Sequence, residues 1–287
     1  MHTDYTRQTI PPDTAFSAQN FVNTDFSKAD LSNVIFKNVN FENCTFNQTK
    51  LNRTRFWCCF FNNCRFTRTD LSQTYLGAWG GGQSNCTFIK CKIAALTDAS
   101  YLINTVFDQC KIKGVELRSL YIDNVQFIGV IDDFRIRKFN TSDISQYQSK
   151  ERTAEVQQII QEKTGISFRH SGETEPNAAI INSIDFSQAR LQYVDVSHCK
   201  IKRICVADDA KHLWIAKNLG HIAQQVYADI EINWQDESNK SWALSCTKSF
   251  LKASFGLVSY YDFKHFENDA FAEKLMALFI HYQSESD

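Results

Sequence analysis

Ten cysteines among 287 residues are the first candidates for chemistry, because thiolates act as nucleophiles and bind metals. The cysteines form no Cys-x2-Cys pair and the seven histidines are scattered, so we predict no metal site. Three cysteines, Cys58, Cys205 and Cys246, leave a reactive or regulatory thiol open as an alternative. The other seven fall at the small, inward position of a five-residue pattern, where we expect buried apolar thiols: Cys44, Cys59, Cys64, Cys86, Cys91, Cys110 and Cys199.

Other catalytic signatures are missing from the sequence. There is no Gly-x-Ser-x-Gly motif, no papain-like cysteine context and no His paired with a carboxylate on a known scaffold. Asp132 and Asp133 are adjacent acids at the end of the pattern, where carboxylates are usually solvated. The sequence therefore predicts a protein that is not an enzyme and needs no cofactor or metal.

Two segments are candidates for binding another protein. Gly80, Gly81 and Gly82 lack the Lys-Ser/Thr and following helix of a phosphate-binding loop. They predict a flexible excursion or, alternatively, a partner-contacting loop with Trp79 as an exposed aromatic anchor. The second segment is basic and favours an acidic partner, although a solvated charged surface is the alternative; it contains Arg135, Arg137 and Lys138.

The element that must position these residues is an internal repeat. From Phe16 to Leu76 a bulky apolar residue returns every five positions, thirteen times in succession, with a small or β-branched residue usually two positions earlier. Neither a helix nor a flat strand keeps such residues on one face, so the chain must turn once per five residues. Residues twenty apart match best, which predicts four sides per coil and a stacked interior: Phe26, Leu31, Phe46, Leu51, Phe66, Leu71, Cys44 and Cys64.

The repeat resembles a known family. Residues 29–33 (ADLSN) and 69–73 (TDLSQ) are similar to the A-(D/N)-L-X-X unit of pentapeptide-repeat proteins. The resemblance covers roughly residues 14–136 and 182–208, about half of the chain. It implies a right-handed quadrilateral β-helix, a mainly β solenoid.

The remaining segments define the domain organisation. We predict an N-terminal tail (1–13), a β-helix (14–207) and an α-helical C-terminal region (208–287) that seals the solenoid's end. A helical insertion at about 145–180 interrupts the β-helix, and Gly165 suits the position after its helix. The expected helices are 145–163, 219–232, 237–254 and 269–283, and residues 171–177 are an expected loop.

Charge separates the hypotheses on function. Residues 12–141 contain 15 Lys and Arg against 11 Asp and Glu, whereas residues 208–287 contain 7 against 12. Some proteins of the resembled family protect DNA gyrase by resembling duplex DNA, which requires a strongly negative rod. The basic rod instead favours a non-enzymatic, rigid protein-binding scaffold. A DNA-mimicking gyrase or topoisomerase protector, and a bacterial effector with activity in the C-terminal helices, remain alternatives.

Composition sets the expected surroundings. The chain has no run of 18 apolar residues and no Sec-type leader at its start, so we expect no membrane span. The frequent unpaired cysteines favour a reducing, cytoplasmic location. The expected partner is a protein of unknown identity, with a homodimer as a further expectation and no direct binding of nucleic acid.

Overall fold

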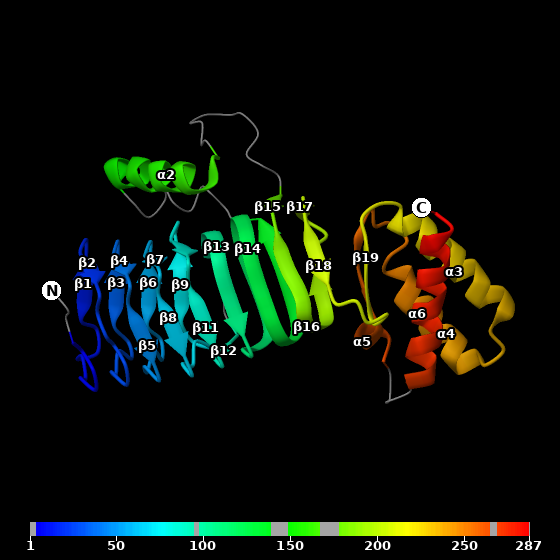
Figure 1. Ribbon diagram of the computed structural model, residues 1–287, viewed down its shortest axis with the longest axis horizontal. Coiled ribbons are helices and arrows are strands. Elements are labelled where there is room, and N and C mark those ends of the chain that lie inside the picture. The colour runs from blue at the N-terminus through cyan, green and yellow to red at the C-terminus, as the bar shows by residue number, and fades with distance from the viewer. Residues whose placement is uncertain (1–3, 95–97, 139–148, 167–177, 265–268, 287) are drawn as a thin grey trace.

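The computed structural model describes residues 4–94, 98–138, 149–166, 178–264 and 269–286. It is a parallel β-solenoid of about eight turns, followed by a smaller helical region (Figure 1). The predicted fold class, a mainly β solenoid with a helical insertion and a helical C-terminal region, is confirmed.

The interior of the solenoid is a set of stacked columns. Strands one coil apart pair in parallel with a register of twenty residues, so that Phe16 lies opposite Phe36 and Phe36 opposite Phe56. The rings of Phe46 and Phe66 are 4.5 Å apart and 3° from parallel. All eight interior residues named from the repeat are buried. Stacked apolar side chains therefore supply the hydrophobic stabilisation of the rod.

The corners of the rod use backbone that most residues avoid. The residue two after each bulky position commonly has a positive φ, a conformation that asparagine tolerates better than other side chains. On one edge the corner asparagines also bond to each other, since Asn43 donates to Asn23 at 3.0 Å and Asn124 donates to Asn104 at 2.9 Å. This asparagine ladder comprises Asn23, Asn43, Asn63, Asn85, Asn104 and Asn124, with one break, because Asn85 donates to Asn62 rather than to Asn63.

Most solenoid strands are short because the chain turns at every corner. They are β1 (Ala15–Ser17), β2 (Asn20–Val22), β3 (Ile35–Lys37), β4 (Asn40–Glu42), β5 (Thr45–Asn47), β6 (Arg55–Trp57), β7 (Phe60–Asn62), β8 (Arg65–Thr67), β9 (Tyr75–Ala78), β10 (Gly82–Ser84), β11 (Thr87–Ile89), β12 (Lys92–Ile93), β13 (Asp98–Asp108), β14 (Lys111–Lys138), β15 (Ala179–Ile181), β16 (Ile184–Asp195), β17 (Cys199–Ile201) and β18 (Ile204–Val206).

The solenoid begins earlier than expected. The Tyr5 N–H donates to the Asp25 carbonyl at 2.8 Å, and the Ile10 N–H donates to the Asp30 carbonyl at 3.0 Å. The Tyr5 ring also stacks on Phe26. Residues 4–13 thus belong to the first coil, and the prediction of a separate tail was wrong for them. One extra residue between Ile10 and Phe16 hid the pattern.

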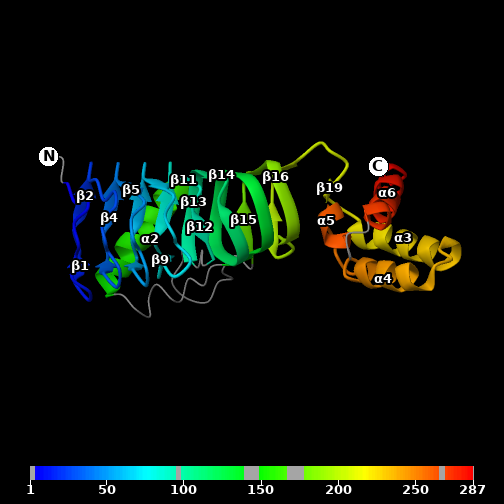
Figure 2. The ribbon, with the colours of Figure 1, turned by 90° about the horizontal axis from the view of Figure 1, so that it is seen from below.

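Helix α2 (Lys150–Thr164) lies along one side of the solenoid (Figures 1 and 2). Ser149 caps its start, and Gly165 ends it with a φ of 71°, as expected from the sequence. Buried Val156 and Ile160 belong to one apolar cluster with four residues of the solenoid surface: Cys58, Phe60, Tyr101 and Leu120. The predicted first turn at 145–148 and the loop at 171–177 lie outside the described residues.

The C-terminal region has its own apolar core. The second helix was predicted over 237–254 but ends at Lys248, and the region also contains two short strands and one short helix that were not predicted. No helix of the described chain is both long and apolar enough to span a membrane. The elements are β19 (His212–Ile215), α3 (Leu219–Asn233), α4 (Glu237–Lys248), β20 (Gly256–Ser259), α5 (Tyr260–Phe263) and α6 (Asp269–Ser284), with β19 antiparallel to β20.

Candidate functional site

The helical region is attached to the solenoid through side chains. Strand β16 pairs with β18 only as far as Phe186, so its later backbone groups lack a following strand. The Leu191 N–H donates to His212 Nε2 at 3.0 Å, and Ser259 Oγ donates to the Leu191 carbonyl at 2.7 Å. The Tyr193 N–H donates to Asp262 Oδ1 at 2.7 Å. These three contacts satisfy part of the strand edge and fix the helical region beside it.

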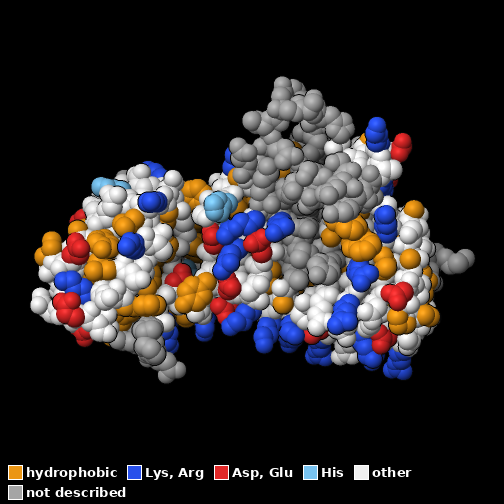
Figure 3. Space-filling view, turned by 180° about the vertical axis from the view of Figure 1, so that it is seen from behind, with side chains coloured by type: hydrophobic (Ala, Val, Ile, Leu, Met, Phe, Trp, Pro, Cys, Tyr) orange, Lys and Arg blue, Asp and Glu red, His pale blue; other side chains and the backbone are white. Residues whose placement is uncertain are grey.

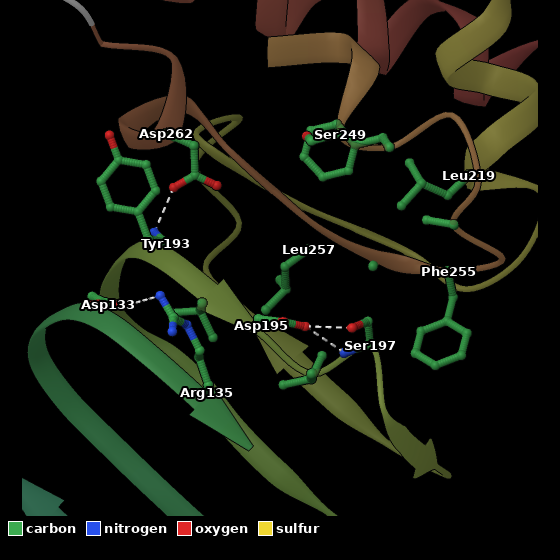
Figure 4. Close-up of a pocket in the computed structure, with 15 residues that line it drawn as sticks. Asp133, Arg135, Tyr193, Asp195, Ser197, Leu219, Ser249, Phe255, Leu257 and Asp262 are labelled. Carbon is green, nitrogen blue, oxygen red and sulfur yellow. Dashed lines mark hydrogen bonds and ion pairs between the residues drawn. The ribbon is translucent and has the colours of Figure 1, made fainter. Parts of the chain in front are cut away.

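A cleft of about 330 Å³ lies at this junction (Figure 4). One wall consists of the last solenoid coils, and the other consists of the helical region and β20. We call it the junction cleft. Its main lining residues are Asp133, Arg135, Tyr193, Val194, Asp195 and Ser197 from the solenoid, and Leu219, Phe250, Phe255, Leu257 and Asp262 from the helical region.

The carboxylates of the junction cleft have different environments. Burial opposes ionisation of Asp195, but hydrogen bonds from Ser197 and the ion pair with Arg137 at 2.8 Å hold its pKa below the ordinary value. Burial raises the pKa of Asp262 to about 6, against the opposing hydrogen bond from the Tyr193 N–H. Asp262 is therefore a group that titrates near neutral pH inside the cleft wall.

The adjacent acids noted in the sequence are not a catalytic pair. Asp133 binds Arg135 at 2.8 Å, whereas Asp132 binds Lys113 at 2.7 Å. His212 is also committed, because its Nε2 accepts a backbone N–H and its Nδ1 faces Asp209 at 3.1 Å. The proton consequently resides on Nδ1, and the accepting nitrogen is not directed at a nucleophile. Among the described residues, no group of three or more His, Cys, Asp or Glu is arranged to hold a metal.

The structure separates the residues that the sequence analysis selected for binding. Arg135 lines the junction cleft, and Arg137 lies behind it through the ion pair with Asp195. Trp79 is half-buried, with its ring centroid 4.6 Å from that of Trp57. It lies in a different part of the rod, at a corner that follows β9.

The glycine segment is packed rather than flexible, which corrects that part of the prediction. Gly81 and Gly82 are buried, as is Gly80 before them. A Cβ on Gly81 would lie 2.4 Å from the Cys59 carbonyl oxygen, and one on Gly82 would lie 2.4 Å from the Tyr101 ring. The glycines therefore permit the close approach of Tyr101, which in turn belongs to the cluster beneath α2.

Two of the three cysteines outside the inward positions, Cys58 and Cys246, are poor nucleophiles in the structure. Cys58 faces outward, yet α2 covers it, and burial raises the pKa of its thiol despite nearby Arg152. Burial likewise raises the pKa of Cys246 to about 11. Cys205 is half-buried. The seven cysteines at inward positions are all buried, with free thiols.

Sequence reasoning missed the cleft residues of the helical region. Asp262, His212 and Ser259 follow no repeat, and nothing in their local sequence relates them to Leu191 or Tyr193. Their position became evident only from the contacts across the junction.

The fold and its stacked five-residue sides define a parallel β-solenoid protein. The family model for pentapeptide repeats matches residues 13–48 and 46–77, with eight copies of the repeat. The chain is therefore a pentapeptide-repeat protein.

Two solved structures match the chain at low identity. A trypsin-treated form of QnrB1, a plasmid-mediated fluoroquinolone resistance protein, is 10% identical over 72% of this chain and 92% of its own, with a TM-score of 0.33. HetL, a pentapeptide repeat protein involved in heterocyst differentiation regulation from the cyanobacterium Nostoc sp. strain PCC 7120, is 11% identical over 71% of this chain and 87% of its own, with a TM-score of 0.34. Scores this low indicate nothing about partner or activity. No curated protein sequence matches the chain.

Proposed function

We propose that the protein is a non-enzymatic, rigid scaffold that binds another protein at the junction cleft. The observation that carries the proposal is a concave site between two separately packed bodies, the solenoid and the helical region. Little ordering is required of such a site on binding, which favours affinity.

The composition of the junction cleft supports a protein ligand. Phe255 and Leu257 offer apolar contact, and the Arg135 side chain is 51% exposed beside them. Tyr193 is 50% exposed at the same cleft. Aromatic and arginine side chains around an apolar centre are typical of residues that dominate protein–protein binding.

The alternative functions find less support. A DNA mimic needs an acidic rod, whereas the rod here has more Lys and Arg than Asp and Glu. An effector activity in the helical region would need a catalytic constellation, and the described His212 and Asp262 are both engaged with the solenoid backbone.

The test is affinity capture from extracts of the source organism, with bound proteins quantified by mass spectrometry. Arg135→Glu combined with Tyr193→Ala should reduce capture of the specific partner by about tenfold or more, the loss of one or two central contacts. Arg65→Glu is the matched control, because Arg65 is an exposed arginine on β8. Equal capture by all three proteins would refute binding at the junction cleft.

A further inference from the structure

A second hollow lies on the solenoid, away from the junction. Along one edge the corner residues of successive coils have long side chains, from Arg68 through Lys90 to Gln109. The next corner is Gly129, with a φ of 108°, where an added Cβ would lie 3.3 Å from the Gln109 α-carbon. Beside this corner lies a hollow of about 470 Å³, lined by Cys110, Ile112 and Val130 among others, with Val130 49% exposed.

Two lysines line this hollow, together with the carboxylate of Asp132. Lys111 and Lys113 line it, and Lys92 pairs in register with Lys111 from the coil before. Lys92 and Lys113 have carboxylate partners, Asp70 and Asp132 respectively. Within the described part of the chain, neither Lys90 nor Lys111 forms an ion pair with a carboxylate. Figure 3 shows Lys and Arg side chains gathered along the lower edge of the solenoid. We call the hollow and its lysines the basic hollow.

A complementary surface lies on the helical region. Residues 228–239 contain four Asp or Glu and no Lys or Arg. The α3–α4 turn, at the end of the helical region away from the solenoid (Figure 1), presents Glu231, Asp236 and Glu237, all exposed. Between them in sequence is Ile232, whose side chain is 74% exposed. We call these four residues the acidic corner.

Ile232 is the most exposed large apolar side chain among the described residues, and its full burial in a contact would contribute about 1.5–3 kcal/mol. The acidic corner and the basic hollow are complementary in charge, and each also has an apolar centre. Carboxylates flank one apolar side chain on the acidic corner, and ammonium groups flank an apolar recess in the basic hollow.

We propose that the acidic corner of one copy of this chain docks in the basic hollow of a second copy, with Ile232 beside Val130. A two-fold axis generates the contact twice, because each copy provides one corner and one hollow. The assembly is then a closed dimer with two identical contacts.

Sedimentation velocity of the full chain tests the proposal, at about 50 mM and about 500 mM NaCl, which span weak and strong screening. The expected result is a dimer that weakens at high salt. Lys111→Glu with Lys113→Glu should weaken self-association by about tenfold or more, and so should Glu231→Lys with Glu237→Lys. Arg53→Glu with Arg65→Glu, at exposed positions nearer the N-terminus, is the control and should leave the dimer intact.

A mixture of the two charge-reversed variants tests whether the acidic corner contacts the basic hollow directly. Each variant alone has like charges across both contacts, whereas the mixture restores opposite charges at both, so a heterodimer should form. Ile232→Ser should weaken the wild-type dimer without changing its charge. A monomer at both salt concentrations, a dimer indifferent to these substitutions, or failure of the mixture to associate would each overturn the proposal. Circular dichroism confirms that each variant is folded.

Discussion

Gln83 offers the sharpest test of the solenoid core. It occupies the inward position between Phe61 in the coil before and Leu102 in the coil after. Its side chain is 1% exposed, and neither its Oε1 nor its Nε2 has a hydrogen-bond partner among the described residues. A buried polar group without a partner costs about 1–3 kcal/mol. Replacing the amide by the similarly sized thioether of methionine removes that cost and retains the packing volume.

Gln83→Met should therefore raise the free energy of unfolding by about 1–3 kcal/mol. In a protein of 287 residues the melting temperature should rise by about 2–5 °C. Differential scanning calorimetry and urea unfolding followed by circular dichroism measure the change. Gln188→Met, at an exposed position of β16, is the matched control and should have little effect. An unchanged or lower stability for Gln83→Met would show that the buried amide is satisfied in solution, and would refute the reasoning.

Three further predictions concern Asp262, Gly82 and the thiol of Cys58 beneath α2. The folded pKa of Asp262, about 6, lies above its ordinary value of 3.8, so its buried charge destabilises the protein above pH 6 and not below pH 3.8. Asp262→Asn should stabilise the protein by up to about 3 kcal/mol at pH 8 and by less at pH 5; equal effects in urea unfolding at both would contradict this. Gly82→Ala, which forces Tyr101 to move, should cost about 1–3 kcal/mol by calorimetry, and a neutral result would argue against the tight packing. Cys58 should react with a thiol reagent at least about tenfold more slowly than Cys205, and Val156→Asp should remove the difference by loosening α2. Mass-spectrometric mapping measures both rates, and fast labelling of wild-type Cys58 would contradict the prediction.

The repeat made the solenoid predictable, because a five-residue spacing has one physical solution in which every bulky residue points inward. The same argument failed at the N-terminus, where one extra residue after Ile10 breaks the spacing while the backbone still pairs with the next coil. Local patterns predict repeats well and predict their interruptions poorly.

The glycine segment illustrates a deeper limit. Three successive glycines are equally compatible with a mobile loop and with close backbone packing. The outcome here depends on Tyr101 and on α2, which lie about one coil and several coils further along the chain. No local pattern around Gly82 carries that information.

The candidate site was predictable only on its solenoid side. Arg135 was identified because it lies where the repeat ends. Asp262 and Ser259 were not, because a side chain that binds the edge of a strand needs only an acceptor or donor at the right place in space. Such residues do not recur at a regular spacing, so no sequence pattern identifies them.

The asparagine ladder has a consequence for how this architecture can vary in length. Asn43 bonds to Asn23 and to Asn63, which lie one coil away on either side. The removal of the twenty residues of one coil would therefore bring together two asparagine corners that can form the same bond. The distance between the first coil and the junction cleft can therefore be shortened in steps of about 4.8 Å while both ends keep their form. The number of coils therefore sets the length of the rod, independently of the residues at its two ends.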